Sequence, residues 1–189
     1  MDWTVTLICG AAGVGKSRLA AGLSNRYAVP LAEVDDIVTA LMTMTDPAHH
    51  PALHYWDTHP EAQSWDAERI AEHHMRVASA LRPALTAVIA DHVESRAPVI
   101  LEGDYLTPEL AETRGGAVRA VLVSEPDDDQ LVANLRVREP DVPAQRKRVS
   151  VSRLVETELA RRSMGLGVPV VSARPWDTAE ERADQALRG

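Results

Sequence analysis

The sequence contains no phenylalanine and only one cysteine, Cys9, among its 189 residues. Because aromatic residues make up only 4% of the chain, its core must be built from leucine, valine, isoleucine and alanine. A lone cysteine excludes a disulfide framework, so we expect Cys9 to be a small buried strand residue, with a catalytic thiol as the alternative. The chain has neither an apolar run of the ~20 residues that span a membrane nor the start of a signal peptide. These absences predict a soluble, cytoplasmic protein without a membrane partner.

Positive charge is also scarce. The chain has 20 lysines and arginines against 28 aspartates and glutamates, which gives a formal net charge of −8. A general nucleic-acid-binding protein would need a basic face, so this balance argues against a nucleic-acid partner. The Asn-Lys-x-Asp pattern that reads guanine in GTPases is absent as well. Any phosphate-binding site must therefore use local donors rather than the field of the whole protein.

One stretch near the N-terminus carries the strongest signal in the chain. Residues 10–17 fill every fixed position of G-x-x-x-x-G-K-[ST], the phosphate-binding loop. A β-prone run at 4–9 precedes the motif and helix-forming residues follow it, which is the context that the motif requires. Glycines allow the backbone N–H groups to turn inward, where they form an anion cradle with the helix N-terminus. The residues predicted to bind the nucleotide here are Gly10, Ala11, Ala12, Gly13, Val14, Gly15, Lys16, Ser17 and Arg18.

The last residues of the motif carry distinct roles. Lys16 should reach the β- and γ-phosphates, and the hydroxyl of Ser17 should ligate Mg²⁺. We therefore predict ATP and Mg²⁺ as cofactors and Lys16 as a catalytic residue. A glycine-rich loop that matches the motif by chance is the alternative.

Short β-prone runs alternate with helical segments along the chain, which predicts an α/β fold with a parallel sheet and right-handed crossovers. We expect a single domain over residues 1–189, with a substrate-covering helical insert at 43–96 and a lid at 136–150. Pro83 is expected to interrupt the helical region 65–93, because its ring removes a backbone donor. Thr178 and Glu181 form a capping-box pattern at the start of the last helix. The predicted strands are 4–9, 29–34, 98–101, 117–123 and 168–172.

Acidic residues follow two of these strands, at the sheet edge where parallel α/β folds bind ligands. Asp35 is predicted to be the base that takes the proton of an acceptor hydroxyl, whereas Asp36 is predicted to cap the next helix. Helix capping by both is the alternative. Glu102 is predicted to bind Mg²⁺, directly or through water, with a solvated strand-end acid as the alternative. Asp104 could face the substrate or shape the turn, and the sequence leaves this open.

A basic group flanks the proline-bearing loop after the fourth strand. A lid that closes on phosphates would exclude water and neutralise developing charge. We predict that Arg138 and Arg146, which lie nearest the loop, are catalytic; a solvated helical face is the alternative. The whole group is Arg136, Arg138, Arg146, Lys147 and Arg148.

Histidines are concentrated between His49 and His92. A zinc site is one reading of this concentration, but the ligand spacing is poor, and a polar pocket or plain surface is favoured. Trp56 and Trp65, in the same region, are expected to serve packing rather than ligand stacking.

Three further elements, together with the phosphate-binding loop, resemble small P-loop kinases of the nucleoside-monophosphate-kinase-like group. They are Val34-Asp35-Asp36-Ile37, Ile100-Leu101-Glu102-Gly103 and Val170-Val171-Ser172-Ala173-Arg174-Pro175.

Within this group, residues 99–108 look most like bacterial 2-phosphoglycerate kinases. The Val-Asp-x-Ile element is similar to chloramphenicol phosphotransferases, whose matching aspartate is the base, which implies Asp35. The resemblance implies a P-loop NTPase fold with a five-stranded parallel sheet, and it sets Arg174 and Pro175 beside the adenine. The chain departs from the pattern in its histidine- and tryptophan-rich insert and in Tyr105, where 2-phosphoglycerate kinases tend to carry histidine.

The predicted function is an ATP-dependent phosphotransferase that moves the γ-phosphoryl group to a hydroxyl of a small molecule, either a metabolite or an antibiotic. A nucleotide-hydrolysing regulatory switch and a toxin-like nucleotide-sugar kinase are the alternatives.

Overall fold

A five-stranded parallel sheet forms the centre of the computed structural model, which describes residues 2–141 and 145–189. The strand order is β2-β3-β1-β4-β5, so the first strand lies in the middle of the sheet. β1 is buried along its whole length because both of its edges are paired and both of its faces are covered. The strands are β1 (Val5–Cys9), β2 (Leu31–Glu33), β3 (Val99–Glu102), β4 (Val118–Ser124) and β5 (Val170–Ser172). The predicted parallel sheet is therefore confirmed, with each strand within a few residues of its predicted range.

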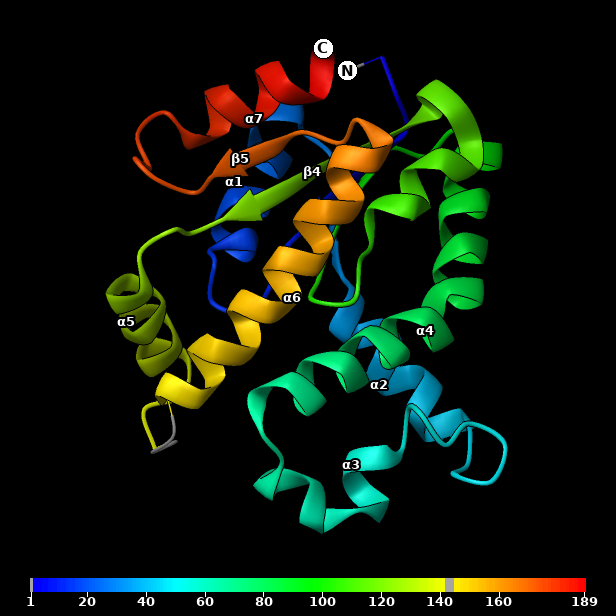
Figure 1. Ribbon diagram of the computed structural model, residues 1–189. Coiled ribbons are helices and arrows are strands. Elements are labelled where there is room, and N and C mark those ends of the chain that lie inside the picture. The colour runs from blue at the N-terminus through cyan, green and yellow to red at the C-terminus, as the bar shows by residue number, and fades with distance from the viewer. Residues whose placement is uncertain (1, 142–144) are drawn as a thin grey trace.

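Helices cover both faces of the sheet (Figure 1). α1 and α7 pack together on one face, and α4, α6 and the 3₁₀ segment η2 pack on the other. α5 lies beyond the end of β4 and packs on α6. The bounds are α1 (Lys16–Tyr27), α2 (Val34–Met44), α3 (Tyr55–Thr58), η1 (Pro60–Ser64), α4 (Ala67–Ser95), η2 (Pro108–Ala117), α5 (Asp128–Arg138), α6 (Gln145–Leu166) and α7 (Ala179–Arg188). No helix of the described ranges is long and apolar enough to cross a membrane.

The predicted interruption at Pro83 is wrong, because α4 runs continuously through this residue. A proline inside a helix costs about 3 kcal/mol. The helix also carries a buried stripe, Val77, Leu81, Leu85 and Ile89, and each of these side chains contributes roughly 1.5–3 kcal/mol on burial. Packing on both sides of the proline therefore outweighs its cost. The ring itself faces solvent.

Two predicted helix caps make no capping hydrogen bond, although Thr178 does stand at the N-cap position of α7 as predicted. α2 begins at Val34, so Asp35 and Asp36 lie in its first turn and Asp36 is not the cap. The helix starts early because Val34 is fully buried against Gly103, where an added Cβ would lie 2.6 Å from the valine Cβ. At α7, the hydroxyl of Thr178 is held by Arg182 and makes no capping hydrogen bond.

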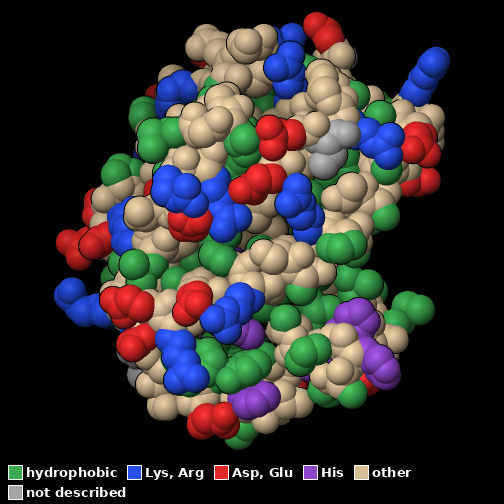
Figure 2. Space-filling view, turned by 45° about the vertical axis from the view of Figure 1, so that its right-hand side comes forward, with side chains coloured by type: hydrophobic (Ala, Val, Ile, Leu, Met, Phe, Trp, Pro, Cys, Tyr) green, Lys and Arg blue, Asp and Glu red, His purple; other side chains and the backbone are tan. Residues whose placement is uncertain are grey.

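The segment between α2 and α4 lies away from the sheet and packs mainly on itself (Figure 1). Its aromatic side chains form a cluster: the rings of Trp56 and Trp65 lie 6.0 Å apart, and Tyr55 lies 4.5 Å from His73 of α4. The predicted packing role of the two tryptophans is confirmed. Histidines gather at this end of the molecule in Figure 2. Within the described ranges, no group of three or more His, Cys, Asp or Glu side chains is arranged to hold a metal ion.

Candidate active site

The phosphate-binding loop joins β1 to α1, and α1 begins at Lys16. Gly15, immediately before the helix, has a φ of 95°, and Gly10 has a φ of 149°, both in the region that favours glycine. Neither position has room for a Cβ atom either. A Cβ on Gly10 would lie 2.7 Å from the carbonyl oxygen of Val123, and one on Gly15 would lie 2.4 Å from the ring of Trp176. The motif residues therefore adopt a conformation that the motif chemistry requires.

Three successive carbonyl groups of the loop accept hydrogen bonds from side chains. Lys16 Nζ donates to Ala11 at 2.8 Å, Ser152 Oγ of α6 donates to Ala12 at 3.0 Å, and Asn134 Nδ2 of α5 donates to Gly13 at 2.7 Å. Two helices that follow much later in the sequence thus hold the loop in shape.

Lys16 also pairs with an acid from the turn that follows β3. Its Nζ lies 2.5 Å from Oδ1 of Asp104, and the lysine side chain is only 5% exposed. Burial acts to raise the pKa of Asp104, but the charge and hydrogen bond of Lys16 outweigh it and leave that pKa below its ordinary value. Asp104 is therefore a carboxylate, and the question that the sequence leaves open for Asp104 has a partial answer: this carboxylate faces the phosphate-binding loop.

Ser17 and Glu102 are brought together as well. Ser17 Oγ donates a 2.8 Å hydrogen bond to Oε1 of Glu102, the buried last residue of β3. Burial raises the pKa of Glu102, while the Ser17 hydrogen bond and the Lys16 charge act in the opposite direction. A hydroxyl and a carboxylate oxygen are ligands that Mg²⁺ prefers, so the donor set fits this ion.

Asp35 lies on the same side of the sheet edge. Its Oδ2 lies 3.7 Å from Nη2 of Arg138 at the end of α5, and its charge acts on His74 and Tyr105, the neighbours of Asp104. Both members of the ion pair are about half exposed, so the pair contributes little to stability. Two residues that the sequence predicts separately, Asp35 and Arg138, are thus in contact.

Arg146 is exposed at the start of α6 and lies apart from this group. With Arg136 and Asp129 it lines a surface hollow of about 520 Å³ between α5 and α6. Among the ion pairs of residues 2–141 and 145–189, none joins Arg146 to Asp35 or Asp104. Residues 142–144 of the predicted lid lie outside the described residues.

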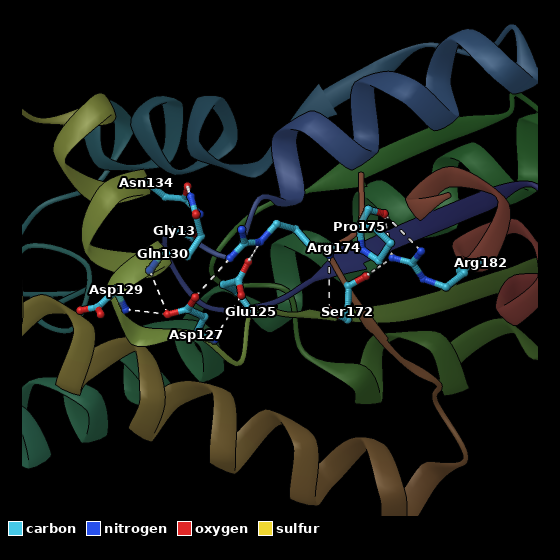
Figure 3. A network of polar contacts seen from close by, with 10 residues as sticks. All are labelled: Gly13, Glu125, Asp127, Asp129, Gln130, Asn134, Ser172, Arg174, Pro175 and Arg182. Atoms are coloured by element: carbon cyan, nitrogen blue, oxygen red, sulfur yellow. Dashed lines mark hydrogen bonds and ion pairs between the residues drawn. The ribbon is translucent and has the colours of Figure 1, made fainter. Parts of the chain in front are cut away.

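Arg174, which follows β5, is held by two carboxylates (Figure 3). Its Nε donates to Glu125 at 2.8 Å and its Nη2 lies 3.6 Å from Asp127. Asp127 in turn caps α5 by accepting from the N–H groups of Asp129 and Gln130. The segment predicted to border the adenine is therefore tied to the start of α5.

Pro175 belongs to the same segment, and its carbonyl accepts from Arg182 of α7. The next residue, Trp176, lies against the loop at Gly15, and the guanidinium of Arg18 lies 4.3 Å from the centre of its ring.

The sequence does not single out His74 or Trp176. Trp176 directly follows the predicted Arg174 and Pro175, so its position was a usable signal. His74 gives no such signal, because α4 brings it to Asp104 from 30 residues earlier in the chain. Its Nε2–H donates to the Asp104 carbonyl at 2.9 Å.

No protein-family model and no curated protein sequence matches the chain. Solved structures do match along nearly the whole chain. Gluconokinase from Sinorhizobium meliloti 1021 superposes with a TM-score of 0.55 at 18% identity, covering 98% of this chain and 91% of that one. A shikimate kinase from Bacteroides thetaiotaomicron gives 0.56 at 14% identity, covering 98% and 99%. Shikimate kinase from Acinetobacter baumannii, in complex with shikimate, gives 0.54 at 12% identity, covering 99% and 92%.

At these identities the likeness concerns the fold. The chain has the fold of P-loop small-molecule kinases, and the predicted fold class is confirmed.

Proposed function

We propose that the protein is an ATP-dependent phosphotransferase that transfers the γ-phosphoryl group to a hydroxyl of a small molecule. The observation that carries the proposal is the phosphate-binding loop itself, with Lys16 and Ser17 in contact with two acids from the end of β3. A fold shared with gluconate and shikimate kinases supports the same reading.

Each residue of the site has a proposed role in binding or in transfer. The N–H groups of residues 10–17 and Lys16 would hold the phosphates, and Ser17 with Glu102 would hold Mg²⁺. Bound ATP and Mg²⁺ supply the phosphoryl group and neutralise part of its charge. Asp35 would accept the proton of the attacking hydroxyl.

The arginines would balance the charge that develops during transfer. Arg138 lies beside Asp35 and is the arginine best placed for this role. Arg146 would have to move toward the loop to take part. Arg18, Arg174 and Pro175 would border the nucleotide at the Trp176 side.

The acceptor is proposed only by class. Residues 43–96 would cover it, and residues 136–150 would close over the phosphates. The resemblance to 2-phosphoglycerate kinases and chloramphenicol phosphotransferases suggests a small hydroxylated compound. The resemblance to the second of these families also supports Asp35 as the base. The proposed site of action is the cytoplasm.

The experiment incubates the protein with γ-labelled ATP, Mg²⁺ and a metabolite extract. We expect a new labelled small molecule, no turnover in Lys16→Ala, and no transfer in Asp35→Asn with ATP affinity kept within about twofold. Asp91→Asn, an exposed acid of α4, is the matched control and should behave as wild type.

Three other results would lead to different conclusions. Equal loss of ATP binding in Asp35→Asn would refute the assignment of Asp35 as the base. Release of phosphate that the extract leaves unchanged would instead indicate a nucleotide-hydrolysing switch, and labelling of a nucleotide sugar would indicate the toxin-like kinase.

A further inference from the structure

The pairing of Lys16 with Asp104 is a contact that the loop motif does not explain. The motif assigns the lysine to the β- and γ-phosphates. In the structure its ammonium is instead shared between Asp104 Oδ1 at 2.5 Å and the carbonyl of Ala11 at 2.8 Å. A triphosphate carries more negative charge than one carboxylate, so a bound nucleotide will draw the ammonium away from Asp104.

Asp104 itself cannot follow the lysine, because its turn is held from two sides. His74 of α4 donates to the Asp104 carbonyl at 2.9 Å, and the His74 ring stacks on Tyr105 at 4.6 Å. On the other side Gly103 packs closely against Val34 of α2. When Lys16 moves to the phosphates, the carboxylate therefore stays where it is, close to the transferable phosphoryl group and without its cation.

We propose that Asp104 aligns the hydroxyl group of the phosphoryl acceptor, and that nucleotide binding uncovers Asp104 by taking Lys16 away. The inference rests on the proposed phosphotransferase function. An unpaired carboxylate beside phosphate oxygens is repelled unless a donor comes between them, and a hydroxyl is such a donor. A hydroxyl that donates to Asp104 has its own oxygen turned toward the phosphates that Lys16 now holds. The site for the acceptor is complete only after the nucleotide has bound.

The charges around Asp104 define the class of acceptor. Once Lys16 has turned to the phosphates, the carboxylates of Asp35 and Asp104 remain on the acceptor side, with Arg138 as the cation beside them. His74 adds no charge at neutral pH, because burial lowers its pKa. A carboxylate or phosphate on the acceptor would be repelled here. The acceptor is therefore a hydroxyl compound that is uncharged or bears an amine.

The first test measures nucleotide affinity and needs no acceptor. Isothermal titration of ADP and of adenylyl imidodiphosphate, each with Mg²⁺, is carried out on wild type, Asp104→Asn and Asp36→Asn. Because Lys16 no longer has to leave a charged partner, Asp104→Asn should bind both nucleotides about fivefold tighter or more. Asp36→Asn removes the same charge from an exposed position outside the Lys16 contacts and should change affinity less than twofold. A mere packing defect would weaken nucleotide binding. If Asp104→Asn binds the nucleotides as tightly as wild type or more weakly, Lys16 does not move from Asp104 to the phosphates and the proposal is refuted.

The second test uses the acceptor recovered from the labelled extract product, whose groups are identified by mass spectrometry. We expect the acceptor to carry a hydroxyl group and no carboxylate or phosphate. An acidic acceptor would refute the proposed class of uncharged or amine-bearing acceptors. In Asp104→Asn the KM for this acceptor should rise at least about tenfold while the KM for ATP falls. In Asp35→Asn kcat should fall instead. An unchanged acceptor KM in Asp104→Asn overturns its aligning role, whereas the absence of any labelled product in wild type overturns the phosphotransferase function itself.

Discussion

Replacing Gly15 with alanine tests whether the shape of the phosphate-binding loop depends on glycine as the structure indicates. An alanine at φ 95° costs about 1–2 kcal/mol in a left-handed conformation. Its Cβ would also lie 2.4 Å from the Trp176 ring, which must then leave its preferred rotamer at about 0.5–1.5 kcal/mol. The sum is about 1.5–3.5 kcal/mol of lost stability. For a chain of this length that corresponds to a fall in Tm of about 3–14 °C.

The control and the partner variant separate the two parts of this cost. Gly165 lies in α6, and a Cβ there meets nothing within 4 Å, so Gly165→Ala should stabilise the protein by up to about 1 kcal/mol. In a double-mutant cycle with Trp176→Ala, the loss of stability that comes from the clash of the added Cβ with the ring should disappear, while the loss that comes from the left-handed backbone should remain. Thermal and urea unfolding provide the free energies. A Gly15→Ala variant as stable as wild type refutes the reasoning, and so does a Trp176→Ala background in which the glycine no longer matters at all.

Three further predictions concern the rest of the fold. Pro83→Ala should stabilise the protein by about 1–3 kcal/mol, because the ring is exposed within a continuous helix; urea unfolding that shows a loss would mean that the proline is needed there. Cys9 should resist thiol reagents at pH 8 in the native protein and react only after denaturation, because burial raises its pKa to about 12; rapid native labelling would contradict its place in the core. The hydrogen bond from Arg188 holds the pKa of Asp184 below its ordinary value against the effect of burial, and the hydrogen bond from Tyr27 and the nearby arginines act in the same direction. The contribution of Asp184 to the free energy of unfolding is therefore fully present above about pH 4 and is lost as the pH falls through the lower pKa of the folded state. Asp184→Asn should therefore be less stable than wild type at pH 7, and urea midpoints for the two should converge at low pH; a gap that widens on acidification would reverse the assigned sign.

The parts of the structure that the sequence predicts are those controlled by local pattern. The phosphate-binding loop is a contiguous motif with fixed spacing, and the five strands are short apolar runs bounded by polar or glycine residues. Their alternation with helical segments predicts the parallel sheet, whereas the order of the strands comes from the folded structure alone. Cys9 lies in such a run and is fully buried, as expected.

The parts that the sequence misses depend on contacts between distant segments. Pro83 breaks the local rule for helices, and only the packing of the buried stripe on both sides of it explains why α4 continues. Asp36 and Thr178 are good caps by residue type, but the burial of Val34 shifts one helix start and Arg182 occupies the other hydroxyl.

The same limit applies to the site. Asp104 and Lys16 are 88 residues apart, and His74 comes from a third segment, so the contact between them could only be found in the folded chain.

The three loop carbonyls held by Lys16, Ser152 and Asn134 have a thermodynamic consequence. Ordering a loose backbone costs roughly 1–2 kcal/mol per residue, and here that ordering is part of folding rather than of ligand binding. An arriving polyphosphate therefore meets a loop backbone that is already ordered, and the main rearrangement left to binding is the movement of Lys16 from Asp104 to the phosphates. The same hydrogen bonds couple the conformation of the loop to the positions of α5 and α6. A change at Asn134 or Ser152 should alter affinity for phosphate although neither side chain touches it.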